Sequence, residues 1–154
     1  MPPKPKVALI TGGSSGIGRA AALAFADRGE QVVVAARTAD RGETVVGETQ
    51  AAGGAAIFVP TDVSDARQVA DMVAIAVERF GRLDYAMNNA ASIEEPFLKT
   101  ADFTAEQFER SLALNLKSVW LWVNGLGGVA QAFLRVLAFC NPTQAGMPVP
   151  LNRG

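Results

Sequence analysis

The stretch VALITGGSSGIG, residues 7–18, decides the fold of this chain. It begins with a short continuous apolar run, which is typical of a strand covered on both faces in a parallel sheet. A glycine cluster follows, and from Gly16 small and apolar residues recur at helical spacing until Gly29. The stretch therefore predicts a strand, a glycine-rich turn and a helix in direct succession.

The same alternation continues through the first 124 residues. The apolar patterns predict further strands at 31–36, 55–59 and 83–87. They also predict three helices: one at 40–52, one that is capped by Ser64 and ends at Gly81, and one that begins with a capping box at Thr104 and Gln107. Such alternation favours an α/β fold, a Rossmann-type doubly wound parallel sheet of four strands in the order 3-2-1-4, with helices on both faces.

The last thirty residues differ in composition from the rest of the chain. We therefore expect a Rossmann-like domain at 1–124 and a divergent, partly irregular tail at 125–154, in which 129–140 forms a short apolar helix or covers the open edge of the fourth strand. Two tryptophans, Trp120 and Trp122, lie on different faces of the preceding helix. At least one of them is expected outside the core.

The composition of the 154-residue chain excludes several kinds of function. There are 14 Lys+Arg against 15 Asp+Glu, without a basic cluster, so nucleic acid is not an expected partner. The chain has no histidine and one cysteine, Cys140, which exclude a His-ligated metal and an internal disulfide. The longest uncharged run, 118–134, is short for a membrane span, and the apolar run 7–10 is short for a signal peptide, so a cytoplasmic protein is expected.

The glycine turn TGGSSGIG, residues 11–18, is a candidate phosphate site. Backbone N–H groups and the positive end of the helix dipole converge where the strand meets the helix. A P-loop is excluded, because Arg19 and Ala20 follow Gly18 where a nucleoside triphosphatase needs Lys and then Ser or Thr. The alternative is a turn with a purely structural role.

The end of the second strand favours NADP over NAD. An acidic residue there would hold the ribose 2′-hydroxyl of NAD, but the chain has Ala35, Ala36 and Arg37. A guanidinium offers a planar fork of donors that suits a 2′-phosphate. The alternative is that Arg37 is a solvated loop charge.

Three polar positions complete the candidate site. Asp62 follows the third strand, where it can accept a hydrogen bond from an adenine amino group or cap a loop. The pair Asn88 and Asn89 ends the fourth strand, where it can tie loops to a cofactor or form a turn. Asn115 lies on an otherwise apolar helix face and must find hydrogen-bond partners, which a structural bond to backbone would also supply.

The chain resembles the short-chain dehydrogenase/reductase family over roughly residues 5–122. Four features carry the resemblance and occur in the family's order: the spacing Gly-x-x-x-Gly-x-Gly, Asp62, NNAA at 88–91 and Asn115. Ala91 replaces the last glycine of the family's NNAG. The resemblance implies catalytic involvement of Asn115 and a nicotinamide dinucleotide, NADP rather than NAD, held by Gly12, Ser14, Ser15, Gly16, Ile17, Gly18, Arg37, Asp62, Val63, Asn89 and Ala90.

The family's catalytic residues beyond the cofactor site have no counterpart in this sequence. The family uses a Ser and a Tyr-x-x-x-Lys motif, but the one tyrosine, Tyr85, falls within the fourth strand as a core residue and is followed at the fourth position by Asn89. We therefore expect a truncated or frame-shifted chain that is inactive alone.

Two functions follow from the resemblance. The first is an NADP(H)-dependent oxidoreductase of secondary alcohols or ketones, represented by its cofactor-binding half. A homo-oligomer formed through the helix that carries the tryptophans is part of this expectation. The alternative is a non-catalytic dinucleotide-binding protein, or a product that associates with a full-length homologue.

Overall fold

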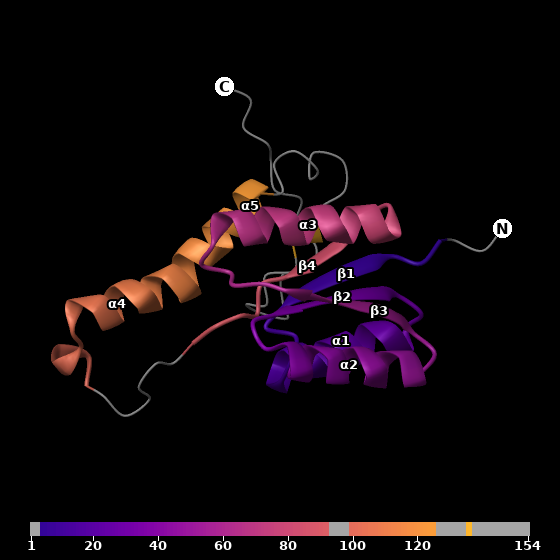
Figure 1. Ribbon diagram of the computed structural model, residues 1–154, viewed down its shortest axis with the longest axis horizontal. Helices are drawn as coiled ribbons and strands as arrows, with labels where there is room; N and C mark the ends of the chain where they lie inside the picture. The colour runs from indigo at the N-terminus through magenta and orange to yellow at the C-terminus, as the bar shows by residue number, and fades with distance from the viewer. Residues whose placement is uncertain (1–3, 93–98, 126–134, 137–154) are drawn as a thin grey trace, which may run out of the picture.

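The computed structural model describes residues 4–92, 99–125 and 135–136. Its centre is a parallel sheet in the order β3-β2-β1-β4-β5 (Figure 1). The strands are β1 (Val7–Thr11), β2 (Gln31–Ala36), β3 (Ala55–Pro60), β4 (Tyr85–Met87) and β5 (Arg135–Val136). The predicted Rossmann-type sheet and its order 3-2-1-4 are confirmed.

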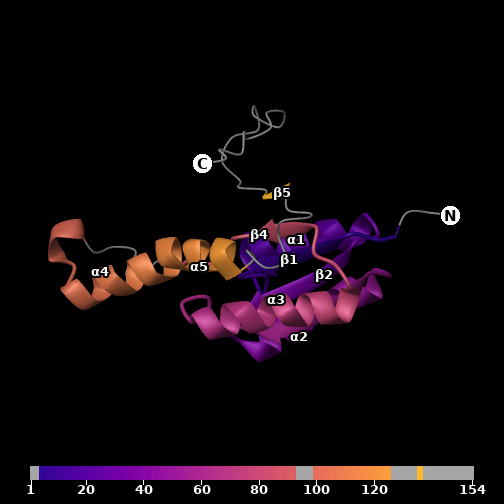
Figure 2. The same ribbon diagram turned by 90° about the horizontal axis from the view of Figure 1, so that it is seen from above.

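Helices cover both faces of the sheet. α1 (Gly16–Asp27) and α2 (Ala39–Ala51) lie on one face, and α3 (Ala66–Phe80) and α5 (Ser118–Gly125) lie on the other (Figures 1 and 2). Both faces of β1 and β2 are therefore buried, which explains their continuous apolar runs. One apolar cluster packs the sheet against α3 and α5, and a second packs it against α1 and α2.

The helix ends follow local signals. Gly29 and Gly81 adopt left-handed backbone conformations just after α1 and α3, as their positions predict. The predicted cap at Ser64 is wrong by one residue, because the Asp65 carboxylate accepts from the backbone N–H groups of Arg67 and Gln68. Ser64 instead donates to Asp62.

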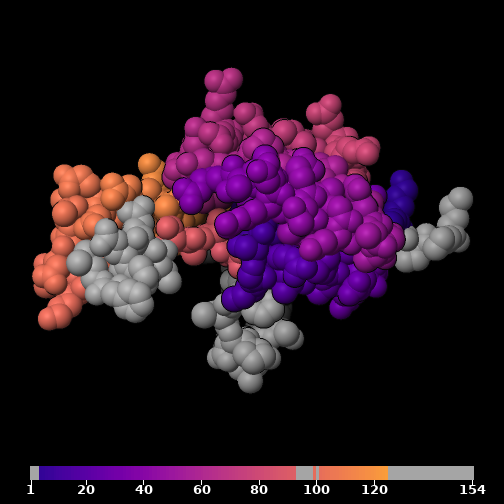
Figure 3. Space-filling view, turned by 60° about the horizontal axis from the view of Figure 1, so that its bottom comes forward, coloured from indigo at the N-terminus to yellow at the C-terminus, as the bar shows by residue number. Residues whose placement is uncertain are grey.

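The predicted long helix after β4 is divided into parts. A short 3-10 turn (Thr100–Asp102) precedes α4 (Ala105–Leu112), and the expected capping box at Thr104 and Gln107 is present. A π-helical turn, η2 (Ala113–Lys117), then joins α4 to α5. In the space-filling view, α4 stands out from the body of the molecule as an orange lobe (Figure 3).

The sheet contains one strand more than the sequence predicts. β5 pairs with Tyr85 and Ala86 at the edge of β4, so residues 135–136 are a strand and not part of the short helix expected at 129–140. The other residues of that expected helix lie outside the described ranges. One arginine and one valine show no hydrophobic periodicity and carry no strand signal, because pairing with β4 alone defines this strand. None of the helices in the described ranges is long and apolar enough to cross a membrane.

Candidate functional site

A cleft opens at the carboxyl ends of β1, β2 and β4, with a volume of about 520 Å³. In doubly wound sheets this edge, near the point where the strand order reverses, is where ligands bind. Nine of the eleven predicted cofactor-binding residues line the cleft: Gly12, Ser14, Ser15, Gly16, Ile17, Arg37, Val63, Asn89 and Ala90. The structure thus brings together residues that are up to 78 positions apart (Gly12 to Ala90).

The backbone of the glycine turn forms one wall of the cleft. Gly12 and Gly16 have φ angles of 65° and 52°, in the left-handed region that favours glycine. Ser15 precedes the first turn of α1, and its side chain makes no capping bond to that turn. A Cβ on Gly16 would meet no atom within 4 Å. The space beside the turn is therefore open, and the first N–H groups of α1 have no partner within the helix, which fits a phosphate group.

Gly18 packs against the Gly12 backbone and the Asn89 side chain and does not line the cleft. A Cβ on this residue would lie 2.3 Å from the Gly12 carbonyl oxygen and 2.6 Å from the Asn89 side-chain nitrogen. The glycine thus lets α1 approach the end of β1 closely, as the motif requires.

Thr11 holds the loop after β4 against the end of β1. Its hydroxyl donates to the Met87 carbonyl and accepts from the N–H groups of Asn89 and Ala90, both at 3.1 Å. The Asn89 carboxamide donates to the carbonyls of Thr11 and Gly12. Asn89 therefore fixes the shape of the cleft through backbone bonds, although it also lines the cleft.

Two arginines lie at the opposite wall of the cleft. Arg37 follows β2, and Arg41 lies in the first turn of α2, with Thr38 between them. Both arginines are exposed, and neither forms a hydrogen bond or ion pair with another described residue. Among the described residues, those that line the cleft include no carboxylate. The site is therefore suited to an anionic group.

The sequence reasoning missed Arg41 and Thr38. Arg41 follows Arg37 by four positions, a spacing that brings side chains together on a helix. Because α2 begins only at Ala39, this spacing alone does not predict that both guanidiniums reach one cleft.

Asp62 lies outside the residues that line the cleft. Its carboxylate accepts hydrogen bonds from the backbone N–H and the hydroxyl of Ser64, at 2.9 and 2.7 Å. Its own N–H donates to the Gln68 side chain. The structure thus shows the loop-capping arrangement for Asp62, while its neighbour Val63 lines the cleft.

Asn115 lies in the π-helical turn and is exposed, and Leu112 and Val119 on the same apolar face are each 37% exposed. Its carboxamide accepts from the N–H of Ser92 and donates to the carbonyl of Ser92, both at 3.1 Å. A further bond joins it to Ser111. Asn115 thus binds the backbone at Ser92, next to the cleft, as expected if its role is structural.

Tyr85 is at the amino end of β4, at the edge of the sheet away from the cleft. Its ring packs against Phe25, and its hydroxyl accepts from the Lys6 ammonium at 2.9 Å. Tyr85 is half-buried and not fully in the core as predicted, because the Lys6 contact lies at the surface. This position leaves the tyrosine remote from the glycine turn.

Known proteins are similar to this chain in sequence and in fold. The model of the short chain dehydrogenase family matches residues 6–132. An uncharacterized oxidoreductase of Listeria monocytogenes is 36% identical over 131 residues, which are 85% of this chain and 51% of the relative. A 2,5-dichloro-2,5-cyclohexadiene-1,4-diol dehydrogenase of Sphingobium indicum is 40% identical over 121 residues, 77% of this chain and 46% of that enzyme.

Solved structures lead to the same family. The crystal structure of a short-chain type dehydrogenase/reductase from Mycobacterium marinum has a TM-score of 0.74 and 37% identity, and the match covers 78% of this chain and 48% of that one. The chain spans about half the length of the relatives it matches. The family model, the relatives and the solved structure agree: this chain belongs to the short-chain dehydrogenase family.

Proposed function

We propose that this chain binds a nicotinamide dinucleotide in the cleft and prefers NADP(H) to NAD(H). The main support is that two guanidiniums, those of Arg37 and Arg41, line the same cleft as the glycine turn and form no ion pair with a described residue. The turn would hold the pyrophosphate through its N–H groups, and the arginines would hold the 2′-phosphate. The cofactor, when bound, supplies hydride chemistry.

The oxidoreductase reading places this chain as the cofactor-binding half of an enzyme that acts on a secondary alcohol or ketone. The domain boundary at 124, the catalytic involvement of Asn115 and the adenine contact of Asp62 stay predictions of this reading. Because Tyr85 is remote from the cleft and no Tyr-x-x-x-Lys occurs in the sequence, we expect no turnover by the chain alone.

An exposed apolar stripe supports association with a second copy or with a full-length homologue. The stripe follows the α4–η2–α5 segment and consists of Phe108, Leu112, Leu116, Val119, Trp120 and Val123, which are 37–65% exposed. Apolar area of this extent on a projecting helix is typical of an interface. A non-catalytic dinucleotide-binding partner would use the same surface.

A titration with NADPH and NADH tests the cofactor proposal. We expect Arg37→Ala and Arg41→Ala each to weaken NADPH binding by about tenfold to a hundredfold, because a charge-assisted hydrogen bond to phosphate is lost. NADH binding should stay within about twofold, since that ligand lacks the phosphate. Arg28→Ala, an exposed arginine outside the cleft, is the matched control. Equal affinities of the unaltered chain for both nucleotides would contradict the role of the arginines.

A coupled absorbance assay tests the expectation of no turnover. With NADPH and a panel of small ketones, the purified chain should consume cofactor no faster than a Gly16→Val variant. Turnover that Gly16→Val abolishes would show that the chain is an enzyme by itself.

A further inference from the structure

Trp122 carries a buried polar atom that the fold does not account for. The side chain is 2% exposed and belongs to the apolar cluster between the sheet and α3. Its indole nitrogen, Nε1, is buried and has no hydrogen-bond partner among the described residues. Because buried donors in native proteins are almost always paired, this N–H calls for an acceptor.

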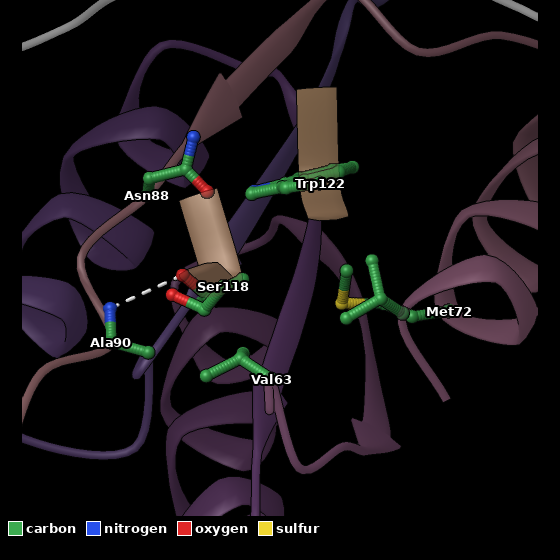
Figure 4. A pocket seen from close by; sticks show the side chains of 8 residues that line it. Val63, Met72, Asn88, Ala90, Ser118 and Trp122 are labelled. Atoms are coloured by element: carbon green, nitrogen blue, oxygen red, sulfur yellow. Dashed lines mark hydrogen bonds between the residues drawn. The ribbon is translucent and has the colours of Figure 1, made fainter. Parts of the chain in front are cut away.

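Asn88 offers an acceptor at the same place. It follows β4 directly and lines one small pocket together with Trp122, and Figure 4 shows its carboxamide and the edge of the indole turned toward one another. The carboxamide forms no hydrogen bond within the described ranges, and the side chain is exposed and therefore free to rotate. The indole can only donate, whereas the carboxamide oxygen can accept.

The other groups around the pocket are less suitable. The space is too small to hold a water molecule. The Thr11 hydroxyl already donates one hydrogen bond and accepts two. The Ser118 hydroxyl donates to the Leu114 carbonyl at 2.6 Å and lies one turn before Trp122 on the same helix. Ser118 is thus the competing acceptor that an experiment must separate from Asn88.

We propose that the Trp122 indole N–H donates a hydrogen bond to the Asn88 carboxamide oxygen and so holds the Asn88–Ala90 loop against α5. Ala90 and Val63 line both this pocket and the cleft, so the loop is the wall between them. Trp122 is therefore a positioning residue for the cleft. Its effect on cofactor affinity rests on the proposed function, whereas the hydrogen bond itself does not.

Nuclear magnetic resonance of the indole group tests the bond directly. The chain has two tryptophans, so Trp120→Phe leaves Trp122 as the single source of an indole signal. In this background we expect Asn88→Ala to shift the Nε1–H resonance and to speed its exchange with water by about tenfold or more. Asn88→Asp keeps an acceptor oxygen and should restore slow exchange, and Ser118→Ala should leave the signal in place. An unchanged signal in Asn88→Ala, or a signal displaced only by Ser118→Ala, would overturn the proposal.

A double-mutant cycle on NADPH affinity tests the positioning role. We expect Asn88→Ala and Trp122→Phe each to weaken binding by about threefold to tenfold, and the double variant to bind no more weakly than either single variant. Additive losses, or no losses, would overturn that role. If Trp122→Phe fails to fold, the resonance data still decide the bond. If the unaltered chain binds no NADPH, the proposed function fails while the resonance experiment still decides this inference.

Discussion

At the scale of single residues, Gly16 and Gly18 serve the cleft in different ways. The space beside Gly16 is open, and its φ of 52° costs a side-chain-bearing residue conformational strain. The space beside Gly18 is filled by the Gly12 carbonyl and the Asn89 side chain. One glycine therefore shapes the binding surface, and the other permits the packing beneath it.

Alanine substitutions separate these two roles. Gly16→Ala should lower the free energy of unfolding by only about 1 kcal/mol, through strain, but weaken NADPH binding by tenfold or more, because the methyl group enters the cleft. Gly18→Ala should lower the free energy of unfolding by about 2 kcal/mol or more, because its methyl group overlaps backbone. Urea denaturation and nucleotide titration measure both effects. Equal stability losses in the two variants would contradict the assignment.

At the scale of elements, α2 contains two glycines, Gly42 and Gly47, which have the same low helix propensity. A Cβ on Gly42 would lie 2.1 Å from a Phe58 ring carbon, so a side chain at this position would require the ring to move. A Cβ on Gly47 would meet no atom within 4 Å. Both glycines weaken the helix, but only at Gly42 does the packing against Phe58 favour a residue without a side chain.

This difference predicts opposite effects of the same substitution. Gly47→Ala should raise the free energy of unfolding by about 0.5–1 kcal/mol through helix propensity. Gly42→Ala gains the same propensity but should lower the free energy of unfolding by about 1–2 kcal/mol, because the Phe58 ring must move. Thermal and urea unfolding of the two variants provide matched controls for one another. A stabilising Gly42→Ala would show that the ring adapts without cost.

The cap of α3 makes stability depend on pH. Hydrogen bonds from the backbone N–H groups of Gln68 and Arg67 lower the pKa of the Asp65 carboxyl in the folded chain. The stabilisation by this carboxylate is therefore fully present above the unfolded pKa, about 3.9, and is lost as the pH falls through the lower folded value.

An alanine variant measures the contribution of this cap. At pH 7, Asp65→Ala should lower Tm by about 2–4 °C, and the difference from the unaltered chain should close below about pH 4. Asp65→Asn keeps an acceptor oxygen and should remain within about 1 °C of the unaltered chain at pH 7. A difference that stays constant down to pH 2 would exclude the carboxylate as its source.

At the scale of the whole molecule, the α4–η2–α5 segment presents the exposed apolar stripe away from the core, in which helices cover both faces of the sheet. Leu116 and Trp120 are 65% and 62% exposed, whereas Trp122 on the same segment is buried. One face of this segment thus packs into the core, and the other face is exposed.

Charge on the stripe should prevent association. Leu116→Asp with Trp120→Asp is expected to convert a dimer into a monomer, as measured by light scattering during size-exclusion chromatography, because a carboxylate in an apolar interface is costly. Ile75→Asp places the same charge at a 40% exposed site on α3 and should leave the dimer intact. A monomer before any substitution would contradict association through this stripe.

The sequence by itself determined the order of strands and helices, most of their limits and nine of the residues that line the cleft. These features depend on local periodicity and on glycines at fixed positions, which the chain carries wherever it folds. The tertiary structure alone decided which partners the polar side chains find. It placed Arg37 and Arg41 in one cleft with the glycine turn, brought Asn115 to the backbone of Ser92, and paired β5 with β4. Such partners are set by distances between segments far apart in the chain, and no local pattern encodes those distances.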